Sequence, residues 1–446
     1  MWYFDLVYTG AYKKKGSQHE SMFDEKVENR ILQESNLNKL VTPRYEDYSF
    51  ANIPGTIKNI LGLDAEDSLP ESVLTDVDTG SVEKVAVVFV DAFGYTQWKD
   101  YGKDLDFFEK VINKGKVTPL TAVYPSETAA AVTTINTGLT PLQHSVPSWR
   151  VYVEEIDEIV RTLPFTTIDK QDLSEHDDFR VGDLYEGNTI YNELKSHGIG
   201  STAILPDDIS GSNYNSAVMN DASMIGFENS FDMALKLRTK LEDSSGKEYL
   251  HCYTGQVDSA LHQYGPGSEE HISQLESVSQ ALSKQLIEKV DKDTAEKTLM
   301  ILIADHGQTE ADSEEIIDLL GFDTVKKNLK RDNSGDIILP TGGPRTVILH
   351  VEQGKVDGVR DFLDQELEAK VLRTEKAISK GLFGGGHANK RNRFGEIVII
   401  PDESGKMIWY DYQDYKTYEE YKGHHGGMSK EEMLVPFAAV KLDELI

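Results

Sequence analysis

The sequence predicts an α/β protein built on a doubly wound, mostly parallel central sheet. Residues 85–90, 249–254 and 298–304 form three largely apolar runs without alternation. Such runs suit strands that are buried on both faces, as in a parallel sheet. Helical stretches such as 188–196 and 269–290 separate the runs. Alternating strands and helices are typical of the doubly wound class.

An acidic residue stands at or near the end of each predicted strand. Asp91 directly follows the first run, Asp258 comes shortly after the second, and Asp305 and His306 follow the third. In sheets of this class, ligands bind outside the carboxyl ends of the strands. We therefore expect these acidic side chains to share one site at one edge of the sheet.

The segment 123–146, VYPSETAAAVTTINTGLTPLQHSV, contains no Lys or Arg. Pro125 ends a preceding extended segment, Ser126 or Thr128 can cap a helix, and Gly138 ends that helix. A hydroxyl at the first turn of a helix faces unpaired backbone NH groups and is well placed for an anionic ligand such as phosphate. The alternative is that Thr128 only caps the helix.

The length of 446 residues exceeds what one small core supports, so we expect one large domain with additions. Residues 1–80 are polar and irregular and are predicted to be an N-terminal extension that packs on a core formed by residues 81–446. Within that core, the acidic, loop-rich segment 150–232 is a candidate lid. Residues 346–400 follow the order strand, helix, strand, glycine-rich loop, strand, which predicts a small α+β subdomain.

The formal net charge of −30 argues against a nucleic-acid polymer as a partner. An anionic small molecule would need metal ions in order to bind. The alternative is that the acidity only keeps the protein soluble.

The cysteine content and the N-terminus indicate the compartment. Cys252 is the single cysteine, which excludes an internal disulfide and fits a reducing environment. The N-terminal stretch carries an acidic residue within its apolar part and lysines after it, unlike a secretory signal. No apolar run approaches membrane-spanning length. We therefore expect a cytoplasmic protein without a membrane partner.

Several Asp and His residues have spacings that suit metal ligands. Asp258 and His262 stand one helical turn apart, and Asp305 and His306 are adjacent. A pair of histidines, His424 and His425, precedes two glycines in GHHGGMS. A ligand set of oxygen and nitrogen without sulfur suits Zn, Mn or Fe. Each motif alone has a plainer interpretation, namely polar residues that face solvent on a helix, or a simple turn.

Taken together, the motifs resemble the alkaline phosphatase superfamily, and most closely its type I phosphodiesterase and nucleotide pyrophosphatase family. The resemblance runs from about residue 85 to residue 440. The motifs that carry it are VDAFG, YPSETAAAVTTINTGLTPLQHS, VDSALHQYG, ADHGQ and GHHGGMSKEEMLVPF, and they follow the order of the family. The resemblance implies an alkaline-phosphatase-like fold and makes residues 81–446 the catalytic domain.

The resemblance also implies a site with two divalent metal ions, for which zinc is expected and Mn or Fe are alternatives. Thr128 would be the nucleophile and would form a phosphothreonine intermediate. One ion would be held by Asp91, Thr128, Asp305 and His306, and the other by Asp258, His262 and His425. His425 is preferred to His424 because the ligand of the family directly precedes the Gly-Gly pair. Arg345 is open between a phosphoryl contact and a structural role.

The implied activity is the hydrolysis of a phosphodiester or pyrophosphate bond in a small phosphate ester or nucleotide. Alternatives on the same core are a phosphomonoesterase, a phosphonate hydrolase or a phosphomutase. A sulfatase is disfavoured, because Ser126 is not followed by the Pro and Arg of the sulfatase motif. The alternative without catalysis is a phosphate-binding scaffold. The oligomeric state and the physiological substrate are not predicted.

Overall fold

The computed structural model describes residues 23–446 except 36, 38, 76, 312–315, 403 and 411–420. Across these described residues, no helix combines the length and the apolar character that crossing a bilayer requires. Of the predicted N-terminal extension, residues 1–80, the structure describes the part from residue 23 onward, except residues 36, 38 and 76.

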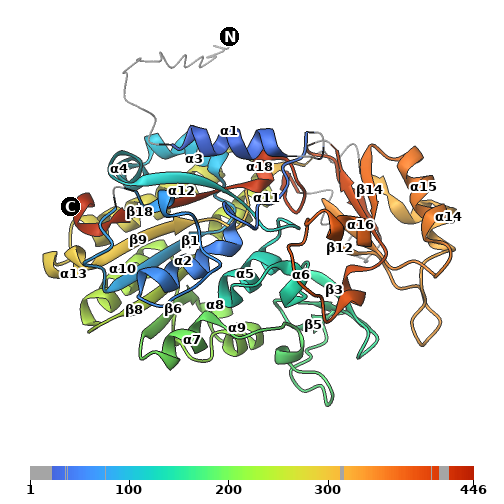
Figure 1. The fold of residues 1–446 in the computed structure, drawn as a ribbon, viewed down its shortest axis with the longest axis horizontal. Coiled ribbons are helices and arrows are strands. Elements are labelled where there is room, and N and C mark those ends of the chain that lie inside the picture. The colour runs from blue at the N-terminus through green and yellow to red at the C-terminus, as the bar shows by residue number, and fades with distance from the viewer. Residues whose placement is uncertain are drawn as a thin grey trace, which may run out of the picture.

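A seven-stranded sheet forms the centre of the molecule, in the order β2-β18-β9-β1-β8-β6-β7 (Figure 1). All neighbouring strands are parallel except β18, which runs antiparallel to β2 and β9. The strands are β1 (Lys84–Val90), β2 (Lys116–Thr121), β6 (Gly200–Pro206), β7 (Ser223–Phe227), β8 (Glu248–Thr254), β9 (Thr298–Ile303) and β18 (Leu434–Lys441).

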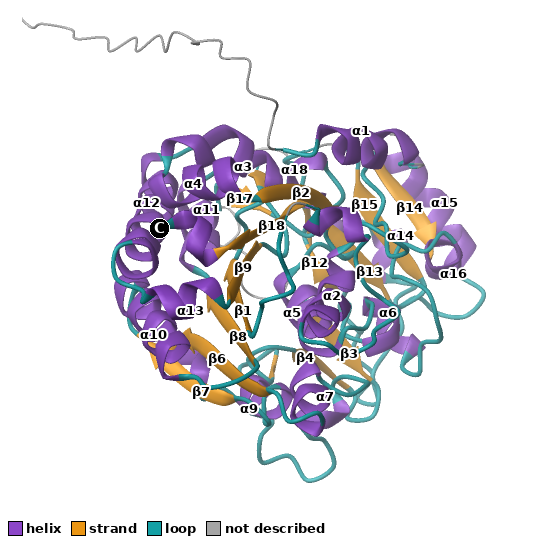
Figure 2. Cartoon of the chain, turned by 60° about the vertical axis from the view of Figure 1, so that its left-hand side comes forward, coloured by secondary structure: helices purple, strands orange, loops and turns teal. Residues whose placement is uncertain are grey.

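The three apolar runs that predicted the sheet form its adjacent inner strands β9, β1 and β8. Every residue of β1 is buried, because helices cover both faces of the sheet. Figure 2 shows α2, α5 and α7 on one face and α4, α10 and α12 on the other. These helices are α2 (Ile53–Ile60), α4 (Asp106–Lys114), α5 (Thr128–Thr137), α7 (Ile190–Ser196), α10 (Ser230–Asp243) and α12 (Glu269–Leu282). The predicted fold class is confirmed.

The described part of the N-terminal segment packs against the central sheet. Helix α1 (Glu25–Glu34) lies along β2, and Phe50, Ile53 and Ile57 are fully buried in the main hydrophobic core. The amphipathic spacing of Val27 and Ile31 on α1 explains which face of that helix is buried.

The predicted lid 150–232 is corrected by the sheet topology. Its first part forms a small antiparallel sheet of β3 (Arg150–Val153), β4 (Glu158–Arg161) and β5 (Thr166–Thr167). Its second part supplies β6 and β7 to the central sheet, so a lid over the whole range is wrong. The strand β6 contains only a short apolar run, Ala203 to Leu205, and the polar residues around it hide this signal in the sequence.

The segment 346–400 contains the predicted strand, helix, strand, loop and strand, with one further helix, α16, after the second strand, and lies at one end of the molecule (Figure 1). Its strands join β12 in a four-stranded antiparallel sheet of order β12-β13-β15-β14. A second hydrophobic cluster, separate from the main core, lies between this sheet and α15. The elements are β12 (Thr341–Gly343), β13 (Thr346–Leu349), α15 (Val356–Glu366), β14 (Ala369–Arg373), α16 (Thr374–Ser379) and β15 (Ile397–Pro401).

Candidate active site

The predicted acidic residues all lie at the carboxyl ends of the inner strands. Asp91 follows β1, Asp305 lies two residues beyond β9, and Asp258 lies in the first turn of α11 (Gln256–Tyr264), which follows β8. Because these strands are parallel neighbours, their ends bring the three carboxylates to one edge of the sheet. The location predicted from the sequence is therefore correct.

Thr128 is the first residue of α5, and Gly138 ends that helix in the left-handed conformation with φ of 71°. The predicted capping needs a correction, because the N-cap residue is Glu127 and no side chain caps the helix. The Ser126 hydroxyl instead donates to the carbonyl oxygen of Gly427 at 2.8 Å. The Thr128 side chain is thus not used as a cap.

The Thr128 hydroxyl points into the cluster of acidic residues and histidines. Its Oγ1 atom lies 3.2 Å from Nε2 of His306. The same Nε2 atom lies 3.3 Å from Oδ2 of Asp305 and 3.6 Å from Oδ1 of Asp91. The four residues expected around one ion are thus gathered about a single imidazole nitrogen.

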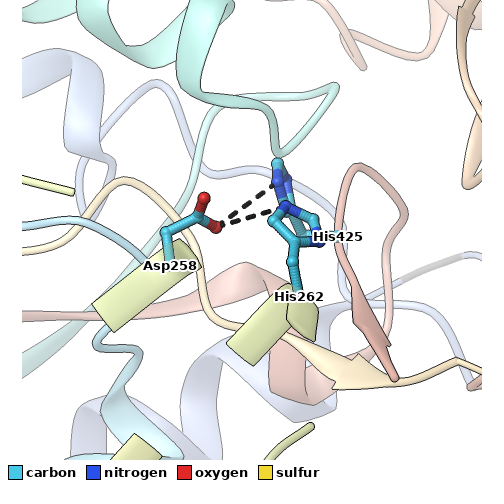
Figure 3. Close-up of side chains that lie close together, drawn as sticks. All are labelled: Asp258, His262 and His425. Carbon is cyan, nitrogen blue, oxygen red and sulfur yellow. Dashed lines mark ion pairs between the residues drawn. The ribbon is translucent and has the colours of Figure 1, made fainter. Parts of the chain in front are cut away.

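The second predicted group is formed by Asp258, His262 and His425 (Figure 3). Oδ1 of Asp258 lies 3.5 Å from Nε2 of His262 and 3.7 Å from Nε2 of His425. A two-residue antiparallel ladder between β10 (Thr309–Glu310) and β17 (Gly423–His424) positions the segment that carries His425. His425 stands in the group with Asp258 and His262, whereas His424, whose ring centroid lies 5.0 Å from that of His262, is in neither group of potential ligands among the described residues.

Backbone carbonyl groups fix the orientation of three histidine rings. The Nδ1 atoms of His262, His306 and His425 lie 2.9, 3.1 and 3.0 Å from the carbonyl oxygens of Gly423, Gly307 and Ser126. A carbonyl oxygen can only accept a hydrogen bond, so Nδ1 carries the proton and Nε2 presents its lone pair to the cluster. This is the usual arrangement of a histidine prepared for a metal ion.

Among the described residues, the potential metal ligands form two groups. One is Asp258, His262 and His425, and the other is Asp91, Asp258 and His306. The first group contains the same three residues as the set predicted for the second ion. The second shares Asp91 and His306 with the other predicted set and adds Asp258, which therefore lies close to both groups.

The unsatisfied oxygens of the cluster fit a bound cation. Oδ1 of Asp91 and Oδ2 of Asp305 are buried and have no hydrogen-bond partner. Burial, and then the charges of Asp305 and Asp258, raise the pKa of Asp91, and burial raises the pKa of Asp305 to about 6. Buried carboxylates without partners are unfavourable, and a divalent ion would compensate their charge.

Burial also keeps two histidines of the cluster in the neutral form. It lowers the pKa of His306 to about 4 and that of His425 to about 3. Neutral imidazole is the form that binds a metal ion. The residues present thus fit a divalent metal in both charge and protonation.

Two contacts to the acidic residues were not predicted from the sequence. The Tyr253 hydroxyl donates to Oδ2 of Asp91 at 2.5 Å, and the side-chain amide of Gln308 donates to Oδ1 of Asp258 at 2.6 Å. Gln308 ends the ADHGQ motif, so that motif could have indicated it. Tyr253 lies on β8 and reaches Asp91 only because β8 pairs with β1.

Arg345 has the structural role that the sequence left open. Its buried guanidinium binds both carboxylate oxygens of Glu432, at 3.0 and 2.9 Å. Glu432 in turn accepts from the backbone NH of Gly427 at 2.9 Å, in the loop that carries His425. Burial raises the pKa of Glu432, but Arg345 and the backbone donors outweigh this effect and lower it to about 2.

Two cavities meet at Thr128. The larger has a volume of about 1250 Å³ and the smaller about 350 Å³. Thr128, Trp149 and Asp258 line both cavities. A reacting group held at Thr128 can therefore have one substituent in each cavity.

The central sheet and the cluster at its edge agree with the alkaline-phosphatase-like fold and site that the sequence motifs imply. The family model described as type I phosphodiesterase / nucleotide pyrophosphatase matches residues 85–428. The chain belongs to this family, whose members hydrolyse phosphodiester or pyrophosphate bonds. No curated protein sequence matches the chain.

Solved structures show the same fold. Murine ectonucleotide pyrophosphatase / phosphodiesterase 5 aligns with a TM-score of 0.59 at 18% identity, over 80% of this chain and 88% of the other. An inactive variant of the same murine protein in complex with AMP aligns with the same values. The human protein aligns with a TM-score of 0.58 at 15% identity, over 80% and 87% of the two chains.

Proposed function

We propose that this hydrolase cleaves a phosphodiester or pyrophosphate bond of a small nucleotide-like molecule, with Thr128 as the nucleophile. The observation that carries the proposal is the 3.2 Å approach of Thr128 Oγ1 to Nε2 of His306, beside the carboxylates of Asp91 and Asp305. A hydroxyl that only capped a helix would bond the backbone of that helix instead.

The proposed site holds two divalent ions, with zinc as the expected metal and Mn or Fe as alternatives. Asp91, Thr128, Asp305 and His306 would hold one ion, and Asp258, His262 and His425 the other. When bound, such ions supply positive charge that lowers the pKa of a coordinated hydroxyl and neutralises phosphoryl oxygens. The unpartnered oxygens of Asp91 and Asp305 support this assignment.

The residues of the chain contribute position and polarity. The backbone NH groups of Thr128 and Ala129 lie in the first turn of α5, where helix geometry gives them no partner within the helix, and such groups suit the oxygens of a phosphoryl group. Thr128 Oγ1 attacks phosphorus, the bond from phosphorus to the leaving oxygen breaks, and the leaving group departs with the electron pair. Water then hydrolyses the phosphothreonine and restores the hydroxyl.

The larger cavity suits the organic part of a nucleotide. Five Trp, Tyr and Phe side chains line it, and its volume exceeds the range of roughly 300–1,000 Å³ common for small-molecule sites. These residues are Trp149, Tyr214, Phe227, Tyr253 and Tyr264. The AMP complex of a protein with the same fold is consistent with this assignment. We further propose that the protein acts in the cytoplasm, a location that cell fractionation would test.

The test is an assay of purified protein with nitrophenyl phosphate, bis(nitrophenyl) phosphate and the nitrophenyl ester of thymidine 5′-monophosphate. Zn and Mn are added separately, and a chelator is the control. We expect a higher kcat/KM on the two diesters and a loss of turnover in the chelator. A preference for the monoester would overturn the proposed bond type, and full turnover in excess chelator would overturn the proposed metal site.

A further inference from the structure

Gln308 lies where three segments that carry potential metal ligands meet. It follows His306 by two residues, in the loop between β9 and β10. The strand β10 begins at the next residue and pairs with β17, which directly precedes His425. The side chain of Gln308 reaches the third segment, the first turn of α11, which carries Asp258. Gln308 is buried at this junction, with 3% of its surface exposed.

The side-chain amide of Gln308 is directed at Asp258. Its Nε2 atom donates to Oδ1 of Asp258 at 2.6 Å and to the backbone carbonyl oxygen of the same residue at 3.4 Å. A carboxylate and a carbonyl can only accept hydrogen bonds, so the amino group of Gln308, and not its carbonyl oxygen, must face Asp258. The amide thus holds both the backbone and the side chain of Asp258.

Close backbone packing fixes the loop from which Gln308 extends. The backbone NH of the preceding residue, Gly307, donates to the carbonyl oxygen of Glu432 at 3.0 Å. A Cβ atom added at Gly307 would come within 2.1 Å of the carbonyl oxygen of Glu431, so this approach of two backbones requires glycine. Gln308 therefore reaches Asp258 from a firmly held support.

The hydrogen bond from the amide leaves Oδ1 of Asp258 able to bind a metal ion. A carboxylate oxygen has more than one lone pair, so it can accept from the amide and still bind a cation. The same Oδ1 atom lies 3.5 Å from Nε2 of His262 and 3.7 Å from Nε2 of His425. Asp258 also belongs to the group with Asp91 and His306. The position of Asp258 therefore affects both groups of potential ligands.

We propose that Gln308 is a positioning residue that holds Asp258 in place for both metal ions. This inference rests on the proposed two-ion site and gives a role to a residue that is in neither group of potential ligands among the described residues. Loss of a hydrogen bond to a metal-binding side chain typically weakens metal binding by roughly 10- to 100-fold. Because Gln308 shares its loop with Asp305 and His306, it ties the position of Asp258 to that of the ligands after β9.

The test measures the zinc affinity of the apo protein by calorimetry. Gln308→Met keeps the length of the side chain and removes the donor, so both zinc-binding steps should weaken by about tenfold or more. Gln285→Met is the matched control, because Gln285 is also buried and accepts a hydrogen bond from Arg238 at 3.2 Å. Gln285 lines neither cavity and, among the described residues, is in neither group of potential ligands. The control should keep the wild-type affinity, and excess zinc should restore two ions per chain in Gln308→Met.

A second comparison shows whether Gln308 acts through Asp258. Asp258→Ala removes the acceptor of the hydrogen bond. Gln308→Met should therefore weaken zinc binding in the wild-type background, and should have little further effect on the binding step that remains in the Asp258→Ala background. Additive losses in the double variant would mean that Gln308 has only a general structural role, and would overturn the inference.

The outcomes separate this inference from the proposed function. A wild-type protein that binds fewer than two zinc ions contradicts the proposed site itself. A wild-type protein that binds two ions with an affinity that Gln308→Met leaves unchanged overturns the positioning role alone. Melting curves of the metal-free proteins report folding. If Gln308→Met does not fold, Gln308→Asn decides, because its shorter side chain keeps the amide but withdraws it from Asp258.

Discussion

The imidazole rings of His306 and His425 stack with their centroids 3.6 Å apart and their planes 10° from parallel. Nε2 of His306 faces Asp91 and Asp305, whereas Nε2 of His425 faces Asp258. The stack thus joins the two groups of potential ligands into one compact site. A change in one ring is expected to disturb both groups.

His425→Ala should lower the metal content and the turnover, because it removes an Nε2 atom from the group with Asp258. His424→Ala is the matched control, since the neighbouring ring is in neither group of potential ligands among the described residues. Elemental analysis after dialysis against Zn or Mn measures both variants. Equal metal loss in the two variants would contradict the choice of His425.

Asp258→Asn should weaken both metal sites, because Asp258 lies close to both groups. Asp305→Asn should weaken only the site around His306. Titration of the apo protein with zinc, followed by calorimetry, distinguishes one lost binding step from two. The wild type should bind two ions per chain, and a single step in the wild type would contradict the two-ion site.

Thr128→Ala should remove nearly all turnover while the metal ions and inorganic phosphate still bind. Loss of a covalent step raises the barrier by several kcal/mol, whereas loss of a helix cap costs only about 1 kcal/mol of stability. Thr128→Ser should keep a substantial part of the turnover, because the attacking oxygen survives. Mass spectrometry of acid-quenched wild-type protein should find phosphate on Thr128. An active Thr128→Ala variant would contradict the assignment of Thr128 as the nucleophile.

Glu432→Gln should destabilise the fold by about 3–5 kcal/mol, because it leaves the buried guanidinium of Arg345 without its counter-charge. The pKa of Glu432 is lowered from 4.5 to about 2 in the folded protein. The stabilisation by its charge is therefore complete above about pH 4.5 and is lost as the pH falls towards 2. Urea unfolding of both proteins from pH 7 to pH 3 should show a difference that shrinks below pH 4.5. A constant difference would exclude the ion pair as its source.

The sequence alone determined the three inner strands of the central sheet and the position of the acidic residues that follow them. Residues 85–90, 249–254 and 298–304 are largely apolar without alternation, which is typical of strands that are buried on both faces. Such a strand ends where its apolar run stops. Asp91 and Asp305 directly follow two of these runs, so the sequence placed them at the carboxyl ends of the strands. The spacing of Asp258 and His262 likewise follows from one helical turn, without any tertiary contact.

Only the tertiary structure decided which of two neighbouring side chains faces the site. His424 and His425 are adjacent, and their directions depend on the pairing of β17 with β10 and on Gly426, whose φ of 115° a side chain would strain. The role of Arg345 also depends on the tertiary structure, because its partner Glu432 is 87 residues away. The arginines of β3 and β4 lie opposite each other only because these two strands pair. Such contacts join segments distant along the chain, so their geometry depends on how the sheets pack and not on any local pattern.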